Sequence, residues 1–225
     1  MRIEIQNTNK KYIAFFDLDK TLLDGISGKI LIHNAYKYGI LKSHYILQGF
    51  YLSLLHKFGF MNPDRIIVKM VNCLKGVSES SLVNLINKIF NEEIKTLIRD
   101  KAVTEIKDHH SNNGHTVILS ASLFQLCEPI KDFLKMDDLI CSELEISNGL
   151  FTGKSNSKYC YGPVKLKRAI EYCKKYNFSI DQAYFYSDSI SDLPLLKAVG
   201  HPMCVSPDNK LLQIAQMKKW TICDW

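Results

Sequence analysis

The chain has 225 residues, of which 46% are hydrophobic and 23% charged, and these proportions exclude an intrinsically disordered protein. Its net charge of +6 suits an anionic substrate, but Lys and Arg are spread along the chain without a run of like charges, so nucleic acid is not an expected partner. The seven cysteines include no Cys-x-x-Cys pair, which favours buried free thiols over a disulfide framework or a zinc site.

Two stretches of the chain bear on where the protein works. Residues 1–11 are polar and contain no apolar signal core. Residues 43–56 form the longest stretch without a charged residue in the aromatic-rich region, and its 14 residues are too few to cross a bilayer. We therefore expect a cytoplasmic protein without stable insertion into a membrane, in keeping with thiols in a reducing compartment.

The first predicted strand is the apolar run 12–16, which acidic residues follow. The next stretch holds no convincing strand and predicts helices at roughly 29–58, 63–74 and 79–112, the last of them broken or ended by the C-cap signal Asn113-Gly114. A helical block placed after the first strand predicts an inserted cap. We expect a helical cap domain at 25–105 and a catalytic core made of 1–24 and 106–225.

The rest of the chain alternates between strands and helices. Apolar runs predict further strands at 116–119, 183–186 and 202–205, and periodic patterns predict helices at about 124–135, 163–176, 191–198 and 208–218. Ser147-Asn148-Gly149 lies between alternating residues and predicts a small hairpin over 143–153. The alternation predicts an α/β fold with a doubly wound, Rossmann-like parallel sheet.

Polar residues that follow the strands are the candidates for chemistry, because ligands of such sheets bind outside the carboxyl ends of the strands. Asp17 and Asp19 follow the first strand. Two carboxylates ~4 Å apart repel by roughly 4 kcal/mol at an effective dielectric constant near 20, so the pair needs a cation or a proton. Mg²⁺ suits such a site where a phosphate completes its shell. The alternative is that both are turn and capping residues, as aspartates often are.

A second acidic group lies in Ser187-Asp188-Ser189-Ile190-Ser191-Asp192. Asp188 ends the third predicted strand and Asp192 opens the following helix. Each could be a helix N-cap, but two caps four residues apart are redundant for one helix. This spacing favours a functional role for Asp188 and a supporting role for Asp192.

Two further side chains fit the binding of a phosphate group. Ser120 follows the second predicted strand and precedes a helix, where its hydroxyl and nearby amides would hold a phosphate oxygen. We expect Ser120 rather than Ser122 to do so, because Ser120 ends the strand. Lys165 lies in the first turn of a helix opened by Pro163, where a cation opposes the helix dipole, and this indicates another purpose such as neutralising phosphate.

Taken together, these segments resemble the haloacid dehalogenase-like hydrolase superfamily, and in particular its phosphoserine-phosphatase-like branch with a helical cap (subfamily IB). The matching residues, in chain order, are Asp17, Asp19, Thr21, Ser120, Lys165, Asp188, Ser189 and Asp192. The resemblance runs from residue 13 to residue 220, with the cap in the place where that branch carries its helical one.

The resemblance implies a magnesium-dependent phosphatase that hydrolyses a small phosphorylated molecule. Asp17 would attack phosphorus to form an aspartyl phosphate, and Asp19 would protonate the leaving oxygen and later deprotonate the attacking water. Mg²⁺ would be held by Asp17, the backbone carbonyl of Asp19, and Asp188.

The resemblance also assigns the phosphate-binding side chains. Ser120 and Lys165 would hold the phosphoryl oxygens, and Asp192 would position Lys165. Thr21 and Ser189 complete their motifs and would support the site.

Two departures from the branch bear on the substrate. Ile26 stands where phosphoserine phosphatases carry a glutamate for the substrate amine, and residues 120–122 read Ser-Ala-Ser instead of Ser-Gly-Gly. The cap segment 30–60 holds seven aromatic residues and no acidic one; most of them would pack the cap's own core, and some would form an apolar roof over the site. These features predict a larger, less polar monoester than phosphoserine, a lipid phosphate among the candidates.

Other functions remain open to the same residues. A phosphotransferase would use the same intermediate with another acceptor, and a catalytically idle binding protein could keep the fold. A dehalogenase has no need of Asp19, and the signature of a P-loop enzyme is missing from the sequence. Nothing in the sequence specifies an oligomeric state.

Overall fold

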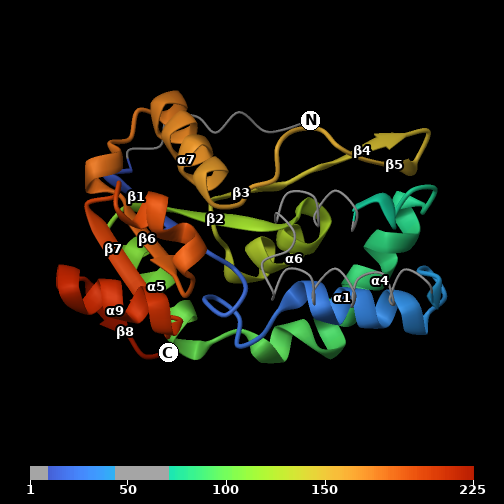
Figure 1. Ribbon diagram of the computed structural model, residues 1–225, viewed down its shortest axis with the longest axis horizontal. Coiled ribbons are helices and arrows are strands. Elements are labelled where there is room, and N and C mark those ends of the chain that lie inside the picture. The colour runs from blue at the N-terminus through green and yellow to red at the C-terminus, as the bar shows by residue number, and fades with distance from the viewer. Residues whose placement is uncertain (1–9, 44–70) are drawn as a thin grey trace.

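The computed structural model describes residues 10–43 and 71–225, and every structural statement below concerns these residues (Figure 1). Residues 63–70 of the predicted helix 63–74 and residues 44–58 of the predicted helix 29–58 lie outside them. So do five of the seven cap aromatics, namely Tyr45, Phe50, Tyr51, Phe58 and Phe60.

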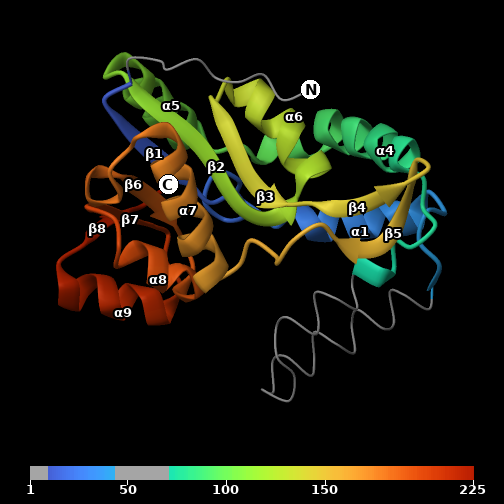
Figure 2. The same cartoon turned by 90° about the horizontal axis from the view of Figure 1, so that it is seen from above.

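Within the described part of the chain, a six-stranded parallel sheet has the strand order β3-β2-β1-β6-β7-β8 (Figures 1 and 2). The strands are β1 (Tyr12–Phe16), β2 (Gly114–Leu123), β3 (Asp138–Ser142), β6 (Tyr184–Ser187), β7 (His201–Val205) and β8 (Thr221–Cys223). The order runs outward from β1 in both directions, which confirms the doubly wound α/β fold and makes the carboxyl end of β1 the switch point.

Alternating side chains of β1 explain how helices cover both faces of the sheet. Ala14 and Phe16 join one hydrophobic cluster, and Ile13 and Phe15 join the other. The helices are α5 (Asp100–Ser111), α6 (Phe124–Leu134), α7 (Pro163–Tyr176), α8 (Leu193–Leu196) and α9 (Asn209–Lys218). Helices α5 and α6 cover the first face and α7, α8 and α9 the second (Figure 2).

A further group of elements lies toward one end of the molecule, on the right in Figure 1. They are α1 (Ser27–Lys37), α4 (Glu79–Glu92), the 3₁₀ turn η1 (Ile94–Leu97) and the hairpin of β4 (Leu144–Ser147) and β5 (Leu150–Ser155). The hairpin is confirmed, and its turn has the positive φ angles that a tight hairpin needs, 51° at Asn148 and 75° at Gly149.

Several predicted boundaries are wrong. The helix predicted over 29–58 stops at Lys37, because Gly39 takes a left-handed conformation (φ 72°) and the amide of Ile40 turns back to Ala35 O at 2.8 Å. The predicted break within 79–112 is found, since this stretch divides into α4, η1 and α5. The stretch 191–198, predicted as one helix, is instead the end of the 3₁₀ turn η3 (Ile190–Asp192) followed by α8. Strands β3 and β8 were not predicted at all.

The segment that leaves the sheet after β1 pairs with the segment that returns to it before α5. Residues 22–24 lie antiparallel to residues 97–99. The amide of Asp24 donates to Leu97 O at 2.7 Å, and that of Arg99 donates to Leu22 O at 3.0 Å. The Arg99 guanidinium also pairs with the Asp24 carboxylate at 2.9 Å. Helix α5, which contains the predicted boundary 105/106, packs on β2. The division into cap and core stays a prediction, and the pairing of residues 22–24 with 97–99 is an alternative place for the end of the cap.

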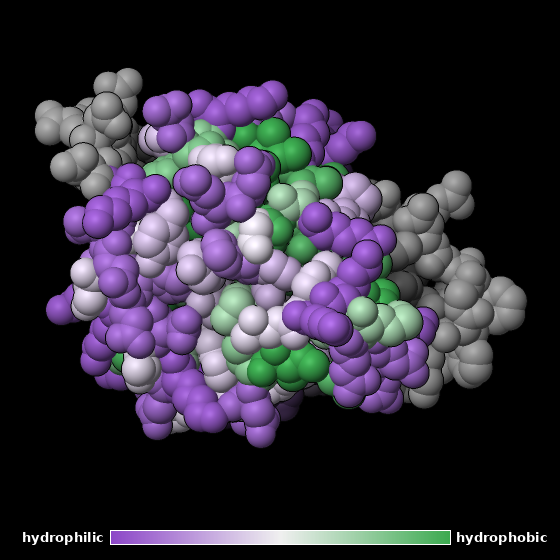
Figure 3. All heavy atoms as spheres, turned by 90° about the vertical axis from the view of Figure 1, so that its left-hand side faces the viewer, coloured by the Kyte–Doolittle hydropathy of each residue, from purple (hydrophilic) through white to green (hydrophobic). Residues whose placement is uncertain are grey.

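The structure bears on two features considered in the sequence, the cysteines and the length of apolar helices. Five of the seven cysteines are buried free thiols, as the sequence predicts, namely Cys127, Cys141, Cys160, Cys173 and Cys204, whereas Cys73 and Cys223 are half-buried. Among the described helices, none is both long and apolar enough to cross a membrane. On the side of the molecule shown in Figure 3, hydrophilic residues cover most of the surface and hydrophobic ones form small groups between them.

Candidate active site

Strand register brings the predicted residues together at the carboxyl end of the sheet. Asp17 follows β1, and its amide donates to Tyr186 O at 2.9 Å, which extends the pairing of β1 with β6 by one residue. Ser120 lies on β2 and Asp188 directly follows β6, each two residues beyond the partner of Phe16. A carboxylate, a hydroxyl and a second carboxylate therefore meet at the switch point.

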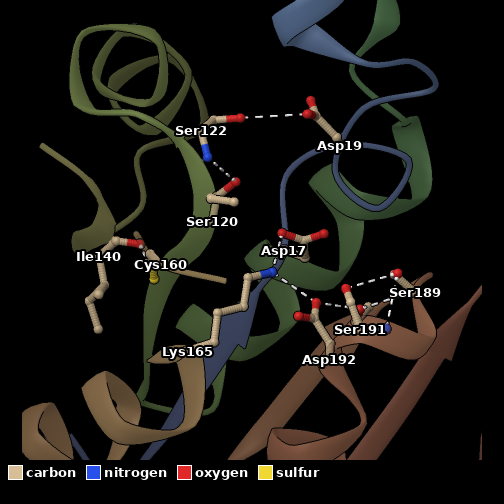
Figure 4. A network of polar contacts seen from close by, with 12 residues as sticks. Asp17, Asp19, Ser120, Ser122, Ile140, Cys160, Lys165, Ser189, Ser191 and Asp192 are labelled. Atoms are coloured by element: carbon tan, nitrogen blue, oxygen red, sulfur yellow. Dashed lines mark hydrogen bonds and ion pairs between the residues drawn. The ribbon is translucent and has the colours of Figure 1, made fainter. Parts of the chain in front are cut away.

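Lys165 joins this group from the other side of the crevice (Figure 4). Its ammonium donates to Asp17 Oδ1 at 2.7 Å and to Asp192 Oδ2 at 2.8 Å. Ser187 Oγ donates to the same oxygen of Asp192 at 2.8 Å. Burial by itself would lower the pKa of Lys165, but Asp17 and Asp192 outweigh it and raise that pKa, so the ammonium stays charged.

Asp19 has different partners from Asp17. The amide of Ser27, the first residue of α1, donates to Asp19 Oδ1 at 2.7 Å. The hydroxyl of Ser122 lies 3.5 Å from Asp19 Oδ2. Figure 4 shows the Asp19 carboxylate turned toward Ser122 and away from Asp17. The two carboxylates are thus held by separate sets of groups, which is what separate chemical roles require.

Ser120 was expected to bind phosphate because it would end the second strand, and the structure shows that it does not end it. Strand β2 does not end at Ser120 but continues to Leu123, with a shift of its register against β3 after Leu119. Ser120 is buried, with 2% of its surface exposed, and its Oγ accepts from the amide of Ser122 at 3.2 Å. Both serines therefore lie in the irregular end of one strand.

Thr21 and Ser189 lie in the turns of their motifs. Thr21 is fully buried, and its Oγ1 lacks a hydrogen-bond partner among the described residues. Ser189 Oγ accepts from the amide of Ser191 at 3.3 Å, so this serine is the N-cap of η3. Capping within this motif is thus performed by Ser189, whereas Asp192 contacts Lys165.

Burial makes the ionised form of the site's carboxylates unfavourable. It raises the pKa of Asp17 to about 7, against the opposing effect of Lys165, and it raises the pKa of Asp188 to about 6. Burial also raises the pKa of Asp19. Each folded-state pKa exceeds the unfolded value, so the contribution of these groups to stability is lost as the pH rises toward 6 and 7. A bound cation would reverse that loss.

The donor atoms at this edge fit a hard divalent cation. The carboxylates of Asp17 and Asp188 and the backbone carbonyl of Asp19 offer only oxygen, which suits Mg²⁺. No group of three or more His, Cys, Asp or Glu side chains in the described residues could hold a metal ion.

Sequence reasoning missed three residues that contact the site. Ser122 and Ser27 contact Asp19, and Ser187 contacts Asp192. Ser122 and Ser187 each lie within two residues of a predicted site residue, and this proximity in the sequence could have identified them. Ser27 carries no such signal, because only the fold of the turn after β1 brings it to Asp19.

Comparison with known proteins gives one family. A family model described as haloacid dehalogenase-like hydrolase matches residues 14–197. A Streptomyces azureus protein named "Inhibition of morphological differentiation protein" is 29% identical over 216 residues, covering 94% of this chain and 78% of the relative. A phosphoserine phosphatase of Mycobacterium tuberculosis is 28% identical over 222 residues, covering 94% of this chain and 70% of its own length.

The fold has a solved counterpart as well. A crystal structure of a Bordetella pertussis protein of unknown function superposes with a TM-score of 0.89 at 23% identity, covering 96% of this chain and 99% of that one. This likeness concerns the fold alone.

Proposed function

The chain belongs to the haloacid dehalogenase-like hydrolase family, and on this premise we propose that it is a magnesium-dependent phosphomonoester hydrolase that works through an aspartyl phosphate on Asp17. The observation that carries the proposal is the buried contact of 2.7 Å between Lys165 Nζ and Asp17 Oδ1, beside a second carboxylate, Asp19, with partners of its own. One carboxylate thus lies beside a phosphate-neutralising cation, and the other is free for proton transfer.

The first step transfers the phosphoryl group to the protein. A carboxylate oxygen of Asp17 attacks phosphorus as the bond between phosphorus and the ester oxygen breaks, and the proton of Asp19 goes to the departing oxygen. The products are the free alcohol, an aspartyl phosphate on Asp17 and an ionised Asp19.

The second step regenerates the enzyme. Asp19 takes a proton from water as the water oxygen attacks phosphorus, and the bond between phosphorus and the Asp17 oxygen breaks. Inorganic phosphate leaves, Asp17 is again a carboxylate and Asp19 is again protonated. One residue therefore serves as the acid in the first step and as the base in the second.

The remaining residues hold the phosphoryl group. Lys165 would exchange its contact with Asp17 for phosphoryl oxygens, while Asp192 keeps the ammonium in place. The Ser120 hydroxyl would donate to another of these oxygens. Bound by Asp17, Asp188 and the Asp19 carbonyl, Mg²⁺ would supply the positive charge that the phosphoryl group needs during transfer.

Removal of divalent metal is expected to abolish turnover. Excess EDTA should stop the reaction and added Mg²⁺ should restore it, because one lysine cannot offset the charge of the buried carboxylates and a phosphate. Ca²⁺ should inhibit, since it takes more ligands at longer distances and would misplace Asp17 for attack on phosphorus. The measurement is the rate of phosphate release in each ion; full turnover in EDTA contradicts the proposed mechanism.

The substrate is expected to be larger and less polar than phosphoserine. Ile26 immediately precedes α1 at its N-cap position, and its side chain offers no hydrogen bond to an amine. Burying an unpartnered ammonium costs several kcal/mol. The described tyrosines of the cap do not add to this argument, because Tyr36 and Tyr38 are 50% and 42% exposed. The related phosphoserine phosphatase of Mycobacterium tuberculosis favours the opposite outcome.

Comparison of kcat/KM on phosphoserine and on a panel of aryl, alkyl and lipid phosphates tests this expectation. The Ile26→Glu variant is the matched control, and it should raise kcat/KM for phosphoserine relative to the apolar esters. A clear preference of the unmodified protein for phosphoserine would contradict the interpretation of Ile26.

A further inference from the structure

The N-terminus of α1 has no capping side chain of its own. Its N-cap residue is Ile26, which makes no side-chain hydrogen bond to the helix. The amide of Ser27, one of the first N–H groups that a helix leaves without an internal partner, donates instead to Asp19 Oδ1 at 2.7 Å. Asp19 therefore caps α1 from outside the helix, and Oδ1 is committed to that contact.

The other oxygen of Asp19 is held more loosely. Ser122 Oγ lies 3.5 Å from Asp19 Oδ2 and 3.5 Å from Ser27 Oγ, longer than the usual hydrogen bond between oxygens. The backbone of Ser122 is fixed in turn, because its amide donates to Ser120 Oγ at 3.2 Å. The end of β2 thus places the Ser122 hydroxyl beside Oδ2, and the Ser27 hydroxyl also interacts with the Asp19 carboxylate and lowers its pKa against the larger effect of burial.

We propose that Ser122 is a positioning residue for Asp19, and that Oδ2, which Ser122 faces, is the oxygen that exchanges the proton with the leaving group and with water. With Oδ1 tied to Ser27, the carboxylate can turn only about that contact, and the Ser122 hydroxyl limits the turn. This inference rests on the proposed role of Asp19 as acid and base. It gives the serine that replaces a glycine of the phosphoserine-phosphatase branch a task distinct from phosphate binding.

The Ser122→Ala variant tests the inference through the leaving group. An alkyl phosphate needs a proton on its departing oxygen, whereas p-nitrophenyl phosphate releases a stable phenolate. We expect kcat/KM to fall ~10-fold on the alkyl ester, the size of one lost hydrogen bond in the transition state, and to change little on p-nitrophenyl phosphate. Ser122→Thr keeps the hydroxyl and should retain most of the activity on both.

A double-mutant cycle shows whether Ser122 acts through Asp19. In the Asp19→Asn background, Ser122→Ala should cause no further loss on the alkyl ester. Ser155→Ala is the matched control, because Ser155 Oγ lies 2.9 Å from Glu143 O and 2.6 Å from Ser157 O, and neither carbonyl belongs to the site residues. That variant should leave the ratio of the two kcat/KM values unchanged.

The outcomes separate this inference from the proposed function. Equal losses on both esters, or additive losses in the Asp19→Asn background, would overturn the positioning role of Ser122. A normal rate of the Asp19→Asn variant on the alkyl ester would instead overturn the role of Asp19, and with it the proposed mechanism.

Discussion

Replacing Asp17 by asparagine is expected to abolish turnover. The amide that replaces the carboxylate cannot attack phosphorus, so the aspartyl phosphate cannot form and no other route to product is available at the site. The measurement is phosphate release at saturating Mg²⁺ with enough enzyme to detect a small residual rate. The loss should appear in kcat, because the remaining phosphate-binding groups, Lys165 and Ser120, are unchanged.

The fold of the Asp17→Asn variant should survive, which makes the loss interpretable. Burial raises the pKa of Asp17 to about 7, so at neutral pH its ionised carboxylate is already unfavourable, and Lys165 keeps its contact with Asp192. Thermal unfolding without added metal checks this point. Asp132→Asn is a matched control, because this exposed aspartate of α6 forms an ion pair with Lys131 and, among the described residues, with no other cation. A near-normal rate of the Asp17→Asn variant would show that the nucleophile is another residue.

Replacing Asp19 by asparagine is expected to slow turnover ~10²–10⁴-fold, the usual contribution of general acid–base catalysis. Asparagine can neither protonate the departing oxygen nor accept a proton from water, whereas Asp17 remains able to attack phosphorus. With an aryl phosphate, whose phenolate leaves without needing a proton, hydrolysis of the aspartyl phosphate should become the slower step. The aspartyl phosphate should then accumulate and be detectable on Asp17 by mass spectrometry of the intact protein.

The control for the trapped intermediate is the double variant Asp17→Asn/Asp19→Asn. It should carry no phosphate after the same incubation, because the nucleophile is missing. Phosphate on the double variant would place the intermediate on another residue. Unimpaired turnover by Asp19→Asn would remove this residue from proton transfer.

Local sequence patterns were sufficient for the strands β1, β6 and β7 and the residues that follow them, whereas β2 extends beyond the predicted 116–119 at both ends. Each strand buried on both faces is a continuous apolar run, and β1, β6 and β7 are recognised in this way to within one residue. The edge strands β3 and β8 were not recognised, because each pairs with one neighbour only and is only partly buried, so neither is a continuous apolar run. The early end of α1 was missed because Gly39 was not recognised as its stop signal.

The amino-acid sequence by itself determined which side chains stand at the ends of the strands, because the polar residue after a buried apolar run must lie at the edge of the sheet. Only the tertiary structure decided which of these side chains touch. Lys165 and Asp17 are 148 positions apart, and Ser122 and Asp19 are 103 apart, so strand register and helix packing bring them together. The amide of Ser27 reaches Asp19 because the turn after β1 folds back onto the start of α1. Such contacts depend on the packed positions of whole elements, which no local pattern of residue types encodes.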